Sequence, residues 1–177
     1  MKSFLVIGLG RFGRAVACEL GSLGHEVLAL DNSEENVQHI ADSVTQAVCG
    51  DAQDESVLTS LGVSNFDCCV VAIGTDIEAS ILVTVMLKEL GAKQVVCKAL
   101  SALHARVLER VGADRVIQPE RSISAARTSS TTSAFRTISL FWRSKRRAAG
   151  SEKRSDSSAC ARGTASTFWP SGTARAA

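Results

Sequence analysis

The chain has 177 residues, of which 45% are hydrophobic and 21% are charged, so it can bury a core and is not disordered throughout. Its net charge of +2 combines a charge of −6 over residues 1–121 with +8 over residues 122–177, so it does not by itself indicate a nucleic-acid partner. No apolar run approaches the roughly 18–20 residues of a membrane span, and six cysteines without a C-x-x-C spacing argue against a metal site and for reduced, cytosolic thiols.

Apolar runs alternate with helical patterns as far as residue 118. The first apolar run is followed by the glycine-rich stretch GLGRFG, and Ser33 is placed to cap the second helix. In chain order the sequence predicts strand 3–8, helix 11–24, strand 26–31, helix 33–41, strand 45–50, helix 54–61, strand 68–74, helix 76–90, strand 94–99, helix 101–111 and strand 115–118.

The predicted strands are continuously apolar, which indicates that both their faces are buried. Six such strands alternating with helices predict an α/β domain with a doubly wound, six-stranded parallel sheet. The ligand site of such a fold lies at the carboxyl ends of the strands, where the strand order reverses. We expect this domain to occupy residues 1–121.

The composition changes abruptly at residue 122. Ser, Thr, Ala and Arg make up 39 of the last 56 residues, which contain no Val and a single Leu. Such a segment buries too little apolar surface to offset the entropy of ordering it. We therefore expect residues 122–177 to form a disordered basic tail.

Residues 8–13 match the pattern G-x-G-x-x-G between a predicted strand and a predicted helix, and Asp31 ends the next strand. This context is typical of dinucleotide binding. Gly8 permits the tight turn, Gly10 lets a pyrophosphate approach the backbone, and Gly13 lets helix and strand pack closely. Asp31 can accept hydrogen bonds from both ribose hydroxyls, and its charge disfavours the 2′-phosphate of NADP.

Other candidate residues lie at the same edge of the predicted sheet. A guanidinium at Arg11, beside the phosphates, could hold a terminal phosphate. Asp51 and Ala52 follow the third strand, and Ile73 and Gly74 end the fourth. Lys98 ends the fifth strand and Glu120 follows the sixth; each is either a ligand contact or an ordinary edge charge.

Two further features bear on function. After the sixth predicted strand there is no folded substrate domain, no Ser/His/Asp arrangement, no paired carboxylates and no positioned base, so a nucleotide site without catalytic groups indicates sensing rather than an enzyme. The predicted helix 76–90 is apolar over more than one stripe, which predicts self-association through the face that does not meet the sheet. Deep burial within the domain is the alternative interpretation.

The sequence resembles the TrkA/KtrA family, the regulatory subunits of bacterial potassium uptake systems with an RCK domain. The resemblance rests on GLGRFG, Asp31-Asn32, GDA at 50–52, AIG at 72–74 and GADRVIQPE at 112–120, and it covers about residues 1–121. It implies a Rossmann-like, nucleotide-sensing gating subunit in the cytoplasm, on the inner face of the membrane. The implied partners are a membrane-embedded potassium-translocating subunit and further copies of the chain, as dimers that build a ring.

The implied ligand is an adenine nucleotide, either ATP/ADP or NAD/NADH. By this resemblance its binding residues are Gly8, Gly10, Arg11, Phe12, Gly13, Asp31, Asn32, Asp51, Ala52, Ile73, Gly74, Lys98 and Glu120. Family members continue with a crossover helix and a small C-terminal domain, which residues 122–177 do not resemble. In a shifted reading frame the codons of 135–142 and 161–172 permit strings similar to these missing parts, so we interpret the tail as the product of a frameshift.

Two other functions compete with this interpretation. A small NAD-dependent oxidoreductase, or its isolated dinucleotide-binding domain, would share the glycine-rich turn but would need a catalytic half. A nucleic-acid binder would rest on the basic residues 122–177 alone, which lack the aromatic residues or groove-reading helix of such proteins. We therefore expect no nucleic-acid partner.

Overall fold

Strands and helices alternate throughout residues 1–119, the part of the chain that the computed structural model describes. The strands are β1 (Ser3–Ile7), β2 (Glu26–Asp31), β3 (Gln46–Cys49), β4 (Cys68–Val71), β5 (Val95–Lys98) and β6 (Arg115–Ile117). The helices are α1 (Arg11–Ser22), α2 (Glu34–Ile40), α3 (Glu55–Ser60), α4 (Ile77–Glu89) and α5 (Ala102–Arg110). Each predicted element is present with slightly shifted ends. The expected tail and its interpretation as a frameshift product concern residues 122–177, which lie outside the described residues.

All neighbouring strands of the sheet are parallel, in the order β3-β2-β1-β4-β5-β6. Strand β1 lies between β2 and β4, so that Phe4 is opposite both Val27 and Cys68. The chain winds outward in one direction from β1 to β3 and in the other from β4 to β6. This arrangement confirms the doubly wound α/β fold, and it puts the reversal of strand order between β1 and β4.

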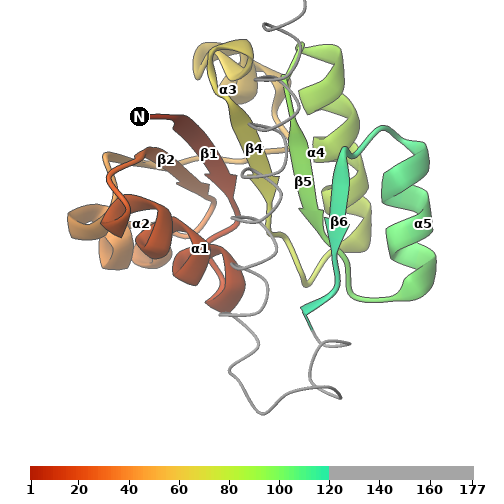
Figure 1. Cartoon of the computed structure of the whole chain (residues 1–177), viewed down its shortest axis with the longest axis horizontal. Helices are drawn as coiled ribbons and strands as arrows, with labels where there is room; N and C mark the ends of the chain where they lie inside the picture. The colour runs from red at the N-terminus through yellow and green to blue at the C-terminus, as the bar shows by residue number, and fades with distance from the viewer. Residues whose placement is uncertain (120–177) are drawn as a thin grey trace, which may run out of the picture. The chain divides into compact units, whose positions relative to one another are not determined.

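Helices cover both faces of this sheet (Figure 1). Leu5 and Ile7 of β1 belong to the same buried cluster as Leu58 of α3, Leu87 of α4 and Leu108 of α5. Helices α1 and α2 pack on β1, β2 and β3, and their place on the opposite face follows from the right-handed β-α-β connections of parallel sheets. Because alternate residues of β1 point to opposite faces and both faces are covered, the strand is apolar at every position after Ser3.

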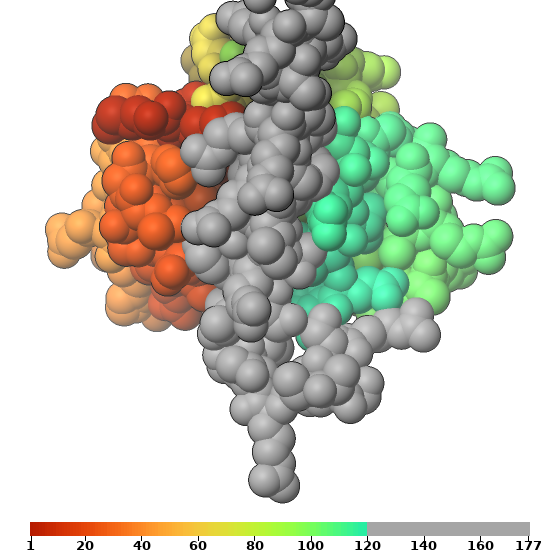
Figure 2. All heavy atoms as spheres, viewed as in Figure 1, coloured from red at the N-terminus to blue at the C-terminus, as the bar shows by residue number. Residues whose placement is uncertain are grey.

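The apolar spread of helix α4 does not by itself indicate which of its faces meets the sheet, and the structure identifies that face. Val83 and Leu87 are fully buried in the core, whereas Ile77 and Leu82 are 44% and 45% exposed. Helix α5, beside β6 at the right of Figure 2, carries Leu103, which is 70% exposed. Ile77 and Leu82 are therefore the most exposed apolar residues that α4 offers to a partner.

Among residues 1–119, no helix has the length and hydropathy to cross a bilayer.

Three cysteines are buried in the strands of the sheet. Burial raises the pKa of Cys69 to about 12 and that of Cys97 to about 11, and it raises the pKa of Cys68 further. Because the thiolate is the reactive form, these groups combine low accessibility with a low thiolate fraction at neutral pH. Cys49, at the end of β3, is exposed.

We expect iodoacetamide at pH 8 to alkylate Cys49 in the folded chain while Cys68, Cys69 and Cys97 remain unmodified. Peptide mass mapping after a timed reaction gives the modified positions. Repeating the reaction in urea, where all the thiols are accessible, provides the control. Alkylation of Cys69 or Cys97 at the rate of Cys49 without denaturant would contradict the buried placement of these strands.

Candidate functional site

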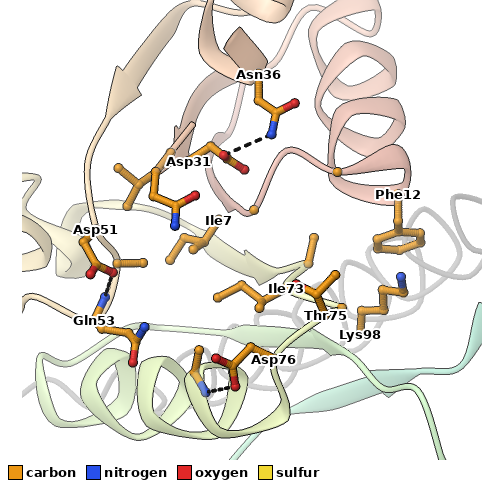
Figure 3. A pocket seen from close by; sticks show the side chains of 18 of the residues that line it. Ile7, Phe12, Asp31, Asn36, Asp51, Gln53, Ile73, Thr75, Asp76 and Lys98 are labelled. Atoms are coloured by element: carbon orange, nitrogen blue, oxygen red, sulfur yellow. Dashed lines mark hydrogen bonds between the residues drawn. The ribbon is translucent and has the colours of Figure 1, made fainter. Parts of the chain in front are cut away.

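A cavity of about 640 Å³ opens at the carboxyl ends of the strands, where the strand order reverses (Figure 3). It collects residues from both halves of the sheet. The residues predicted from the sequence that line it are Gly8, Gly10, Arg11, Phe12, Asp31, Asn32, Asp51, Ala52, Ile73, Gly74 and Lys98. Gly13 does not line it, and Glu120 lies outside the described residues.

The turn after β1 brings the backbone into the cavity. Gly8 has a φ of +89°, a conformation that side chains with a Cβ rarely adopt, and its N–H donates to the Leu30 carbonyl at 2.8 Å. A Cβ at Gly8 would also lie 3.1 Å from the Ile73 nitrogen. The turn is therefore fixed between β2 and the loop that follows β4.

Gly13 lies behind this turn, in the first turn of α1. A Cβ at this position would overlap the carbonyl oxygen of Gly8 and would lie 3.0 Å from the Ala72 Cβ. Gly13 therefore allows the close packing of α1 against β1 and β4. We assign it to packing rather than to direct ligand contact.

The N-terminus of α1 differs from the starts of the other four α-helices in residues 1–119. The side chains of Ser33, Asp54, Asp76 and Ser101 accept hydrogen bonds from the first turns of α2, α3, α4 and α5. Helix α1 begins after Gly10 without a side-chain cap and without an acidic residue in its first turn. Its first N–H groups therefore remain available to an anion, and the helix dipole adds positive potential there.

Asp31, at the end of β2, accepts several hydrogen bonds from the protein. Its Oδ2 accepts from the Leu9 N–H, within the glycine-rich turn. Its Oδ1 accepts from the Ser33 N–H at 2.9 Å and from the Asn36 side-chain amide at 3.1 Å. The carboxylate thereby connects the turn after β1 to the start of α2.

Two cations line the cavity. Arg11 is the first residue of α1, and Lys98 ends β5 on the other half of the sheet. The Lys98 ammonium lies 5.7 Å from the centre of the Phe12 ring, which gives a cation–π contact (Figure 3). A Cβ at Gly74 would lie 2.8 Å from this ammonium, so a glycine there leaves room for the lysine. Both positive groups therefore line the cavity beside the first residues of α1.

The remaining acidic groups of the cavity cap local turns. Asp51 accepts from the Gln53 N–H at 2.8 Å, and Asp76 caps α4 by accepting from the Ala79 N–H at 3.0 Å (Figure 3). Asn36, Gln53 and Leu100 also line the cavity, although the sequence analysis did not predict them. The one signal for Asn36 was its position in the first turn of the helix after Asp31.

The cavity offers anion binding and hydroxyl binding side by side. Backbone N–H groups and two cations surround the start of α1, and a carboxylate lies across the turn from them. Within residues 1–119, no group of three or more His, Cys, Asp or Glu residues is placed to hold a metal ion. This combination matches a phosphorylated ribose, which carries anionic and hydroxyl groups on one molecule.

Several known proteins are similar to this chain. The Ktr system potassium uptake protein A of Bacillus subtilis is 49% identical over 122 residues, which cover 69% of this chain and 55% of that protein. The protein of the same name from Vibrio alginolyticus is 45% identical over 122 residues, 69% of this chain and 56% of that protein. The chain thus spans about half the length of these relatives.

A solved structure has the same fold. The NAD(P)-binding domain of an exopolyphosphatase-related protein from Archaeoglobus fulgidus superposes with a TM-score of 0.63 at 25% identity, covering 70% of this chain and 92% of that one. The sequence model of the TrkA-N domain matches residues 4–119, which include the whole sheet except Ser3, the first residue of β1. The chain therefore belongs to the TrkA-N domain family, as its resemblance to TrkA and KtrA proteins predicted.

Proposed function

We propose that the chain binds an adenine nucleotide at the carboxyl edge of its sheet and uses this binding to regulate potassium uptake. The observation that carries the proposal is the cavity itself, in which the uncapped start of α1 and the Asp31 carboxylate face one ligand volume. The relatives named as potassium uptake proteins support the proposed role in regulating potassium uptake. The role is regulatory rather than enzymatic.

In this proposal the phosphates lie on the turn formed by Gly8 and Gly10, where the first N–H groups of α1 neutralise them. The ribose lies at Asp31, and the base lies toward Asp51 and Ala52, at the end of β3. Ile73 and Gly74 border the ligand from β4. The ligand is ATP/ADP or NAD/NADH, since each carries a phosphate chain on an unmodified adenosine ribose.

Isothermal titration of the full chain with ATP, ADP, AMP, NAD and NADH tests nucleotide binding directly. We expect saturable binding of at least one of them in the micromolar range or tighter. Gly10→Ala, which places a methyl group where the pyrophosphate would approach, serves as the negative control. Equal heats for the unaltered chain and this variant with every nucleotide would contradict the proposed site.

Arg11→Ala is expected to weaken ATP more than AMP, because the guanidinium lies beside the start of α1, where the distal phosphates would be. A charge-assisted hydrogen bond contributes about 1.5–3 kcal/mol, so the loss for ATP is about tenfold to hundredfold. Arg14→Ala is the matched control, since Arg14 is in the same helix but does not line the cavity. Equal losses for ATP and AMP would remove the role of Arg11 at the terminal phosphate.

The proposed partners are a membrane-embedded potassium-translocating subunit and further copies of this chain. We place the chain in the cytoplasm, at the inner face of the membrane, where it senses nucleotides and gates the transporter. The exposed apolar residues of α4, Ile77 and Leu82, support self-association into dimers that build a ring. Lys98 and Glu120 are proposed to complete the ligand site, the latter from beyond the described residues.

Reconstitution tests the gating proposal. The purified chain is added to proteoliposomes that contain the membrane subunit of a Ktr system, and potassium flux is recorded with ATP, with ADP and without nucleotide. We expect the flux to differ between the two nucleotides when the chain is present and to be equal when it is absent. Identical fluxes in the presence of bound chain would contradict regulation by nucleotide.

A further inference from the structure

Asp31 has room for one more hydrogen-bond donor, not two. A carboxylate offers about four acceptor positions, two on each oxygen. Its Oδ1 already accepts from the Ser33 N–H and the Asn36 amide, and its Oδ2 accepts from the Leu9 N–H. With these three bonds in place, one acceptor position remains on Asp31 for the two ribose hydroxyls that it was expected to accept. A second hydroxyl needs another acceptor.

Asn36 provides such an acceptor beside Asp31. Because an ionised carboxylate can only accept, the group that Asn36 turns toward Asp31 must be its NH₂, and the amide oxygen must face the other way. Figure 3 shows this arrangement, with the nitrogen toward Asp31 and the oxygen directed away from it. Among residues 1–119, the Asn36 Oδ1 receives no hydrogen bond, and the residue lines the cavity.

The backbone holds Asn36 in this place. The Asn36 N–H points to the Ser33 hydroxyl at 3.5 Å, as part of the N-terminal cap of α2. The Ser33 N–H in turn donates to Asp31. The carboxylate and the amide oxygen are therefore fixed relative to each other by one short segment, residues 31–36, before any ligand binds.

We propose that Asn36 is the second half of the ribose site, so that Asp31 accepts one ribose hydroxyl and the Asn36 amide oxygen accepts the other. This inference rests on the proposed nucleotide binding and assigns its specificity. Both free positions are acceptors, so the site favours a ribose with two free hydroxyls. A 2′-phosphate presents mainly acceptor oxygens and negative charge at neutral pH, and it has no suitable partner at either position.

Titration calorimetry with ADP, 2′-deoxy-ADP and 3′-deoxy-ADP tests the proposal on the full chain. Asn36→Leu removes the amide oxygen at nearly equal volume. We expect this variant to bind ADP about three- to tenfold more weakly, as expected for the loss of a hydrogen bond between uncharged groups. One of the two deoxynucleotides lacks the hydroxyl that donates to Asn36. For that nucleotide, the fall in affinity caused by Asn36→Leu should be at least threefold smaller than for ADP.

Gln38→Leu is the matched control, because Gln38 is also in α2 but bonds to Glu34 and does not line the cavity. It should leave all three affinities unchanged. If Asn36→Leu weakens the binding of all three nucleotides equally, Asn36 acts only by orienting Asp31, and the proposal is overturned. The proposal is also overturned if this variant binds all three as tightly as the unaltered chain. If the unaltered chain binds none of the three, the proposed nucleotide site itself fails.

Discussion

Gly13→Ala is expected to destabilise the folded chain by roughly 3 kcal/mol, at the upper end of the usual cost of overpacking a core. The added methyl group would overlap the Gly8 carbonyl oxygen, which belongs to the backbone and cannot rotate away. The better helix propensity of alanine offsets at most about 1 kcal/mol of this cost. Urea unfolding followed by circular dichroism measures the change, which should lower the midpoint by roughly 1–2 M.

Gly10→Ala separates this packing effect from ligand binding. A Cβ at Gly10 meets no atom within 4 Å, and the backbone there is extended, with a φ of −61°. The unfolding midpoint should therefore stay within experimental error, while nucleotide affinity falls because the methyl group occupies the approach of the pyrophosphate. A Gly13→Ala chain as stable as the unaltered one would contradict the described contact between α1 and β1.

Val83→Glu is expected to prevent folding. The Val83 side chain is fully buried against the sheet, and an unpaired carboxylate there costs at least several kcal/mol, whether it stays charged or takes up a proton. A domain with a total stability of about 5–15 kcal/mol tolerates little of this loss. Insoluble expression, or a circular dichroism spectrum without helix, is the expected result. A soluble, folded variant would show that α4 presents another face to the core.

Leu82→Glu is the matched substitution one position earlier in α4. Leu82 is 45% exposed, so the fold should keep its stability to within about 0.5 kcal/mol. If α4 forms the proposed contact between copies of the chain, the negative charge of Glu at position 82 should dissociate the oligomer. Light scattering at tens of micromolar then gives an oligomer for the unaltered chain and a smaller species for the variant. A monomer in both cases would remove α4 as a self-association surface.

The sheet could be predicted from the sequence because its strands are buried on both faces. Runs such as residues 3–8 and 68–74 are typical of central strands in a parallel sheet, and Gly8 marks where the first run ends. The short 3₁₀ turns at Ala41–Ser43 and Val63–Asn65 were not predicted. They have no apolar period of their own, and their conformation depends on the elements that they join.

The cavity could be predicted only in part, for a physical reason. Residues that end a strand, such as Asp31 and Lys98, or come shortly after one, such as Asp51, reach the carboxyl edge by topology alone. Asn36 reaches it through the rotation of α2, which the sequence does not define. The same limitation applies to α4, where the sequence did not show that Val83 and Leu87 face the core. An almost wholly apolar helix does not indicate which of its faces meets the sheet.

The central place of β1 in the sheet has a consequence for the order in which the chain folds. The Ser3 N–H donates to the Asp67 carboxylate at a sequence separation of 64 residues, and Phe4 pairs with Cys68. During synthesis, the glycine-rich turn and Asp31 leave the ribosome long before β4 does. The loop after β4 supplies Ile73 and Gly74, so the cavity is complete only after this distant pairing. A nucleotide that binds as proposed would therefore stabilise the complete sheet and not residues 1–49 alone.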